Sequence, residues 1–209
     1  MDFTAERKAM VDSQVRVNDV TDRAIHLAMM AVPRERFCAP ERAFAAYSEE
    51  ALPIAGDRRL MPARDVAKLL QALDARPGEK ALALAGPYAA AVLTRMGLTV
   101  TAQESDEAVV AVVADVLSRE GVATAVAPLD QPTGNGWDLI VCEGGVERVP
   151  ESWGAALRPG GRMAVVERSG AIGKAALFVK TPEGLSRREL FDSSPAVLAE
   201  LTPAPTFAL

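Results

Sequence analysis

The chain has 209 residues, of which 49% are hydrophobic and 24% charged, which is ordinary for a globular protein. Its net charge of −5 argues against a nucleic-acid or anionic-membrane surface. Cys38 and Cys142 lie far apart without metal or redox spacing, so we expect reduced, buried thiols. There is no long apolar run and no signal-peptide pattern at the N-terminus, so we expect one cytoplasmic domain spanning 1–209.

Residues 1–47 are helical by pattern and carry no strand signal. Apolar residues recur at helical spacing from Phe3 to Val15, and a second helix carries Ile25 to Met29 before Pro33 ends it. Residues 40–47 predict a shorter third helix. The only histidine, His26, lies in the second helix, and its apolar surroundings favour a packed side chain over a catalytic base or zinc ligand.

Residues 48–62 are rich in turn formers and predict a long connecting loop, a type of segment that is often functional. Residues 63–76 then predict an amphipathic helix, which Pro77 and Gly78 stop. The N-terminal helical block and this loop together make up 1–62.

From residue 79 the pattern alternates between strand and helix. The expected strands are 80–85, 99–103, 123–127, 138–142, 162–166, 174–180 and 185–191, and the expected helices are 88–96, 106–120 and 151–157. Such alternation predicts an α/β fold of the Rossmann-like kind, with a mostly parallel sheet and helices on both faces. We expect this core to span 63–192 and an extended, proline-bearing tail to span 193–209.

Ligands of open parallel sheets bind beyond the carboxyl ends of the strands. Here the turn Ala85-Gly86-Pro87-Tyr88 follows the first core strand, and Glu104 follows the next strand. An acidic residue about 20 residues after such a turn suits the two hydroxyl groups of an adenosine ribose. The alternative is that Glu104 only assists the start of the following helix. The segments 128–130 and 143–145 should reach the same edge.

The order of these segments resembles the protein-L-isoaspartate O-methyltransferase family over roughly residues 5–180. The resemblance is carried by the segments 10–16, 20–22, 28–37, 46–47, 52–56, 77–79, 88–93, 137–141, 149–151 and 157–162, and by Glu104. It implies the fold of S-adenosylmethionine-dependent methyltransferases, S-adenosylmethionine as cofactor and isoaspartyl residues of damaged proteins as substrate. Ala85, Gly86, Tyr88 and Glu104 are the cofactor-binding positions that the resemblance implies.

This chain departs from the family at both functional loops. The cofactor loop, roughly E-I-G-x-G-S-G-Y in the family, is about two residues shorter here; Ala83 replaces its acidic residue and Pro87 removes an N–H donor. In the substrate loop, roughly G-Q-T-I-S-Q-P, Leu60 replaces the serine, so a catalytic residue is unknown. The loop also carries Arg58 and Arg59, which would clamp a carboxylate or phosphate or, alternatively, pair with surface acids such as Glu49 and Glu50.

These departures argue against S-adenosylmethionine binding and predict a family member that has weakened or lost methyl transfer, a pseudoenzyme that acts as a non-catalytic interaction module. Its apolar N-terminal helices, especially Ile25–Val32, would then cover a protein partner or form a homodimer. The first alternative is an active S-adenosylmethionine-dependent carboxyl methyltransferase acting on isoaspartyl residues of a protein substrate. The second is a protein that binds another small anion through Arg58 and Arg59. None of these readings involves a metal, nucleic acid or a membrane.

Overall fold

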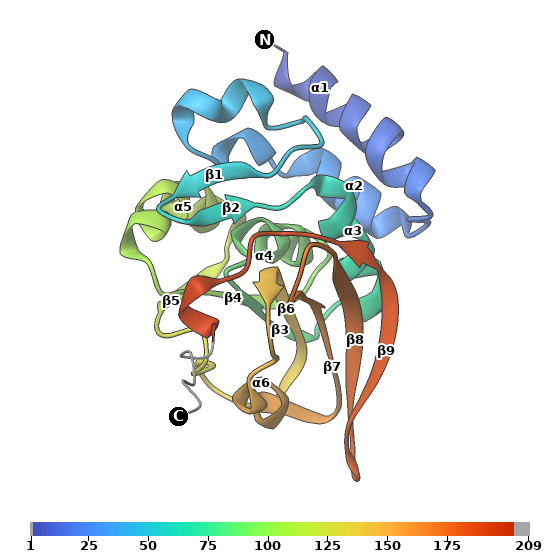
Figure 1. Ribbon diagram of the computed structural model, residues 1–209. Helices are drawn as coiled ribbons and strands as arrows, with labels where there is room; N and C mark the ends of the chain where they lie inside the picture. Colours follow the sequence, from blue (N-terminus) through green and yellow to red (C-terminus); the bar gives the residue numbers. More distant parts are fainter. Residues whose placement is uncertain (1, 203–209) are drawn as a thin grey trace.

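The computed structural model describes residues 2–202, and a seven-stranded sheet lies at its centre (Figure 1). The strand order is β5-β4-β3-β6-β7-β8-β9; β5, β4, β3, β6 and β7 run parallel, and β8 and β9 are antiparallel additions. The strands are β3 (Lys80–Leu84), β4 (Thr99–Glu104), β5 (Ala123–Val126), β6 (Trp137–Val146), β7 (Leu157–Glu167), β8 (Gly173–Thr181) and β9 (Gly184–Ser193). The predicted mostly parallel α/β fold is confirmed.

The sheet separates two hydrophobic clusters of unequal size. Successive residues of β3 alternate between them: Ala81 and Ala83 belong to the larger cluster, Leu82 and Leu84 to the smaller. The larger cluster is covered by α3 (Ala63–Leu73), α4 (Pro87–Arg95) and α5 (Glu107–Glu120), together with the N-terminal block. The smaller is covered by α6 (Glu151–Ala156) and by connecting segments. A strand buried on both faces explains the continuous apolar run in the sequence.

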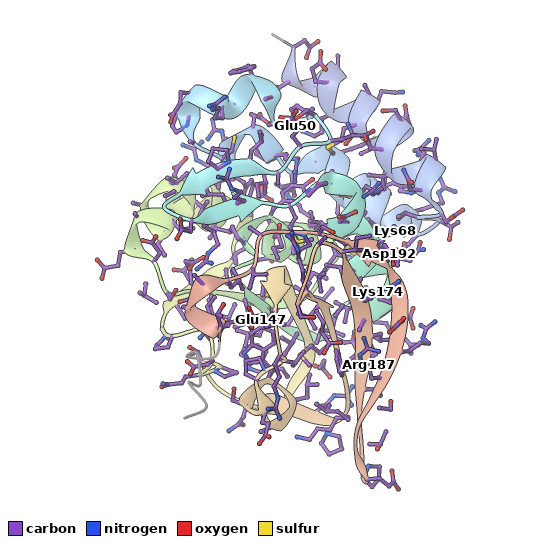
Figure 2. The ribbon with its side chains drawn as sticks, in the orientation of Figure 1. Glu50, Lys68, Glu147, Lys174, Arg187 and Asp192 are labelled. Atoms are coloured by element: carbon purple, nitrogen blue, oxygen red, sulfur yellow. The ribbon has the colours of Figure 1, made fainter. Side chains whose placement is uncertain are left out.

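Charged side chains line β9, the strand at one edge of the sheet. Lys174 of β8 and Asp192 of β9, both labelled in Figure 2, pair across the two strands at 2.5 Å. Arg187 of β9 pairs with Glu167 of β7 at 2.6 Å. Charges on an edge strand discourage pairing with another chain, so this edge is protected against strand addition.

The N-terminal block consists of α1 (Phe3–Met10), a π turn η1 (Val11–Val15), α2 (Arg23–Ala31) and the 3-10 turns η2 (Arg16–Asn18), η3 (Arg34–Arg36) and η4 (Pro40–Ala45). Ile25, Met29 and Val32 are fully buried in the chain's own larger cluster. Ile25, Met29 and Val32 therefore do not cover a partner, because the rest of the chain already covers that face; Leu27, on the outer face, is 62% exposed. His26 is packed as expected, with Nε2 2.8 Å from the Val20 carbonyl oxygen.

Residues 48–62 do not form the predicted connecting loop. They contain an antiparallel hairpin of β1 (Leu52–Ala55) and β2 (Arg58–Leu60), which turns at Gly56 with φ of +50°. The inward residues alternate along the two strands, and Arg58 is one of them. The period-two pattern was hidden by the prolines at 53 and 62, which are tolerated here because the ribbon has only two short strands.

After β9 the chain crosses the sheet instead of running free. Ser193 anchors the crossing, since its hydroxyl donates to Asp65 Oδ2 at 2.6 Å. The following residues pass over the end of β6 and finish in the short turn η5 (Ala199–Leu201) near β4, as the red segment of Figure 1 shows. We name residues 194–201 the strap. The rest of the predicted tail, 203–209, lies outside the described residues. Among residues 2–202, no helix combines the length and apolarity that crossing a membrane requires.

The inward orientation of α2 is tested by two substitutions on the same helix. Ile25→Ala removes a fully buried side chain and should lower the free energy of unfolding by about 2–5 kcal/mol. Leu27→Ala, at a position 62% exposed, should change it by less than about 0.5 kcal/mol. Urea unfolding of both variants measures the difference. Equal losses, or a larger loss for Leu27→Ala, would contradict the described orientation.

Candidate functional site

The carboxyl ends of β3, β4 and β6 meet at one edge of the sheet, and the predicted ligand residues meet there as well. The turn after β3, Glu104 at the end of β4 and Glu143 within β6 lie side by side. A Cβ placed on Gly86 would be 3.4 Å from Glu143 Cγ. The hairpin β1–β2 and the strap cover this edge. The topology therefore brings together the segments that the sequence singled out.

The turn after β3 is tight and already occupied. Ala85 has φ of +48°, a left-handed conformation that costs a non-glycine residue about 1–2 kcal/mol. Gly86 is the N-cap of α4, and Pro87 takes the first helical position, where it has no N–H to offer. The Ala89 N–H, in the first turn of α4, donates to Glu143 Oε1 at 2.5 Å. The helix N-terminus, an anion-binding position, thus holds the protein's own carboxylate.

Glu143 is buried among polar groups that lack full partners. Its Oε2, the Tyr88 hydroxyl and Arg34 Nη1 are buried without hydrogen bonds from the protein. The Arg34 guanidinium lies over the Tyr88 ring at 4.7 Å. Burial raises the pKa of Glu143 to about 7, against the lowering effects of the Ala89 N–H and the Arg34 charge. Burial likewise raises the pKa of Tyr88 to about 12.

Glu104 is paired within the protein. Arg58 of β2 donates from Nε to Glu104 Oε2 at 2.8 Å and from Nη2 to Glu104 Oε1 at 2.6 Å. Arg58 is 7% exposed and Glu104 6%, so this bidentate pair is removed from solvent. Arg58 Nη2 also donates to Glu200 Oε1 of the strap at 2.8 Å. Burial works against the charge of Arg58, but the hydrogen bonds to Glu104 and Glu200 prevail and raise its pKa.

Two sequence alternatives are corrected by these contacts. Arg58 does not pair with Glu49 or Glu50, because the hairpin turns its side chain inward to Glu104. Glu104 is not the cap of the following helix either: Asp106 is the N-cap of α5, and its side chain accepts from the Ala108 N–H at 2.8 Å. Glu104 does accept from the Ser105 and Asp106 N–H groups, at 2.8 and 3.2 Å.

The other residues of the predicted substrate loop divide between core and surface. Leu60 is fully buried and lies opposite Leu52 in the hairpin, so its side chain belongs to the larger cluster. Arg59 alternates outward and is exposed. The carbonyl of Met61 accepts from the buried Arg34 at 2.5 Å. Only Arg58, of the two arginines, reaches the strand ends.

Little space remains beneath the strap. A cavity of about 10 Å³ lies between Arg58, Glu143, Gly144 and the strap residues Pro195–Leu198. A second cavity of about 10 Å³ lies between the turn at Gly86 and the first turns of α5. Sites for drug-sized ligands usually offer about 300–1,000 Å³. An open hollow of about 310 Å³ lies outside the Arg58–Glu104 pair, and one of about 670 Å³ lies between the N-terminal block and α5, away from the strand ends.

Sequence reasoning missed two participants of this site. It placed Glu143 at the edge but did not find that its carboxylate fills the N-terminus of α4. It missed Glu200 altogether, because a Pro- and Ala-rich segment after the last strand indicates only an extended tail. No signal in the sequence joins Glu200 to Arg58, which lies 142 residues away.

The raised pKa of Glu143 predicts a pH-dependent stability. Below about pH 4.5 the Glu143 side chain is protonated in both the folded and the unfolded chain. Between about pH 4.5 and 7 the unfolded chain releases this proton while the folded chain still holds it. The free energy of unfolding therefore decreases as the pH rises through this range. The loss reaches at most about 3 kcal/mol and stays constant above pH 7. Glu143→Gln should therefore gain stability relative to the natural chain between pH 4.5 and 7, as followed by denaturant unfolding. Glu147→Gln, at an exposed position, is the control (Figure 2). A pH-independent difference for Glu143→Gln would contradict the burial effect.

Comparison with known proteins adds the family to this geometry. The model of the family protein-L-isoaspartate(D-aspartate) O-methyltransferase matches residues 5–185. A protein-L-isoaspartate O-methyltransferase of Methylorubrum extorquens is 32% identical over 206 residues, covering 96% of this chain and 90% of the relative. That of Methylorubrum populi is 31% identical over 203 residues, covering 94% and 95%.

Solved structures agree on the fold. A protein-L-isoaspartate O-methyltransferase from Plasmodium falciparum, solved in complex with S-adenosyl-L-homocysteine, superposes with a TM-score of 0.79 at 15% identity and covers 93% of this chain and 98% of its own. Another protein-L-isoaspartate O-methyltransferase gives a TM-score of 0.76 at 21% identity, covering 94% and 67%. The family match over most of the chain and the sequence relatives lead to one conclusion: this chain belongs to the protein-L-isoaspartate O-methyltransferase family.

Proposed function

We propose that this family member does not transfer methyl groups and that it acts as a non-catalytic protein-binding module. The observation that carries the proposal is the buried bidentate pair between Arg58 and Glu104. Glu104 is the residue whose type and position suit the ribose hydroxyls of an adenosyl ligand. With both carboxylate oxygens engaged by Arg58, a ligand must displace a charged partner from a desolvated site.

The helix N-terminus supports the same proposal. A ligand that uses backbone donors after β3 would have to displace Glu143 from the Ala89 N–H, and Pro87 contributes no donor. Each hydrogen bond to a charged group is worth about 1.5–3 kcal/mol, so the loss of two would weaken binding by roughly 10²–10⁴-fold. The two enclosed cavities of about 10 Å³ each are also too small for an adenosyl ligand, and the hollow of about 310 Å³ lies outside the Arg58–Glu104 pair. These residues, as arranged, do not fit S-adenosylmethionine.

The competing candidate is an active protein carboxyl methyltransferase. The comparisons favour it over loss of catalysis, because the relatives matched over nearly the whole chain carry the enzyme's name. The preserved acidic residue at 104 agrees with this candidate. Its weakness is physical: Arg58 would have to leave Glu104, and the chain would have to bind the cofactor with a loop that has one glycine. The two candidates predict different affinities for an S-adenosyl ligand, and this affinity can be measured.

Calorimetric titration with S-adenosyl-L-homocysteine separates the two candidates. If the site is closed, the natural chain should bind S-adenosyl-L-homocysteine with a dissociation constant above about 1 mM, because the ligand must break the Arg58–Glu104 pair. Glu104→Gln should leave this weak binding unchanged. Binding of the natural chain tighter than about 50 μM, abolished by Glu104→Gln, would establish the active candidate.

Methyl transfer itself should be absent even when the missing hydroxyl is restored. Leu60 is fully buried, so Leu60→Ser places a hydroxyl in the core and not in an open cleft. We expect no methylation of an isoaspartyl peptide by the natural chain or by Leu60→Ser, measured with labelled S-adenosylmethionine and a known family enzyme as positive control. Turnover by either chain would refute the proposal.

The pair should also contribute to stability. Arg58→Ala leaves Glu104 buried without its cation and should lower the free energy of unfolding by about 3–5 kcal/mol. Arg59→Ala, the exposed neighbour, should change it by less than about 0.5 kcal/mol. Denaturant unfolding at pH 7 provides both values. A small loss for Arg58→Ala would mean that the pair is not held in solution as described.

A further inference from the structure

The strap lies on the end of β6 as an added strand. Gly145 and Val197 form a parallel bridge, in which the Gly145 N–H donates to the Ala196 carbonyl and the Leu198 N–H donates to the Gly145 carbonyl, both at 2.8 Å. Pro195 and Leu198 face inward and are buried, whereas Ala196 is exposed. This is the geometry by which an extended peptide binds a sheet: backbone hydrogen bonds hold it, and inward side chains fill the surface.

The surface beneath the strap is shaped for an extended backbone. A Cβ on Gly144 would lie 2.8 Å from Leu198 Cγ, and a Cβ on Gly145 would lie 3.3 Å from the Pro195 carbonyl oxygen. A side chain at 144 would therefore displace the buried Leu198 side chain from its place. The opposite wall of this groove is β2 with Arg58, and the remaining gap is about 10 Å³. We name this surface, bounded by Gly144, Gly145 and Arg58, the strap groove.

The strap is attached more weakly than the strands of the sheet. Only two backbone hydrogen bonds join it to β6, whereas each strand of the sheet pairs along most of its length. Its other contacts include the buried side chains of Pro195 and Leu198, the Ser194 hydroxyl on the Gly173 N–H, the Arg168 guanidinium on the carbonyls of 194 and 195, and Glu200 on Arg58 and on the Ser105 hydroxyl. The Glu200 side chain is 33% exposed and lies in the single 3-10 turn η5. A segment held by few hydrogen bonds detaches locally, and the free energy of this local opening is smaller than the free energy of unfolding the whole protein.

We infer that the strap groove is a peptide-binding site, which the strap fills in cis and an extended segment of a partner protein fills when the strap detaches. The partner segment that fits has a small residue, a β-branched residue and a leucine in succession, followed two residues later by a carboxylate for Arg58. This inference rests on the proposed function in one respect, that the ligand of this chain is a protein. It goes beyond the proposed function because it identifies the surface, the strap groove, at which the partner protein binds.

The test uses the full-length chain and a labelled nine-residue peptide with the sequence of residues 194–202. In the natural chain the strap competes with the peptide. Leu198→Asp in the protein removes the buried anchor of the strap, so the affinity for the peptide, measured by fluorescence anisotropy, should rise at least about tenfold. A peptide carrying Leu198→Asp should not bind either chain. Adding Gly144→Val to the Leu198→Asp protein should abolish the gain, because the new side chain fills the groove.

A second variant keeps the inference open to refutation if Leu198→Asp does not fold. Glu200→Ala changes an exposed position and frees one end of the strap, so it should raise peptide affinity several-fold. No gain in either variant, or a gain that survives Gly144→Val, would overturn the strap groove. That result would not contradict the proposal that the cofactor site is closed. Tight S-adenosyl-L-homocysteine binding by the natural chain would refute the proposed function, and it would not change the outcome of the peptide experiment.

Discussion

The buried pair of Arg58 and Glu104 is the interaction on which the arrangement of this edge depends. It joins three parts of the chain: the hairpin that carries Arg58, the sheet that ends in Glu104, and the strap that adds Glu200 to the same guanidinium. A charge is tolerated in such a place only when its partner is equally well positioned. The pair therefore couples the position of the hairpin to β4, and the bond to Glu200 couples the strap to the same guanidinium.

Glu143 repeats the same principle at the neighbouring helix. A carboxylate binds the amide end of α4, where a foreign anion would otherwise be favoured, and Arg34 stands close enough to lower its pKa against the effect of burial. The positions at which the sequence predicts a ligand are thus contacted by side chains of the chain itself. The start of the helix lies close to the Glu143 side chain, since a Cβ placed on Gly86 would be 3.4 Å from Glu143 Cγ.

The regular parts of this structure were predictable, and the site was predictable only in part. Strands such as Lys80–Leu84 and helices such as Glu107–Glu120 follow from apolar runs and periodicity, which are local properties. The position of Glu104 followed from topology. Its pairing did not, because the hairpin was hidden by prolines and an arginine beside a second arginine gives no sign of which one turns inward. The strap escaped prediction since its partners are distant in sequence.

The separation of Arg58 from its partners along the chain has a kinetic consequence. Glu104 follows it by 46 residues and Glu200 by 142, so the guanidinium cannot lose its water until the sheet and the crossing segment are both assembled. Contacts that form after the rate-limiting step of folding change the unfolding rate and leave the folding rate nearly unchanged. We therefore expect this arginine to govern the native lifetime of the molecule, a quantity that matters for persistence in the presence of proteases.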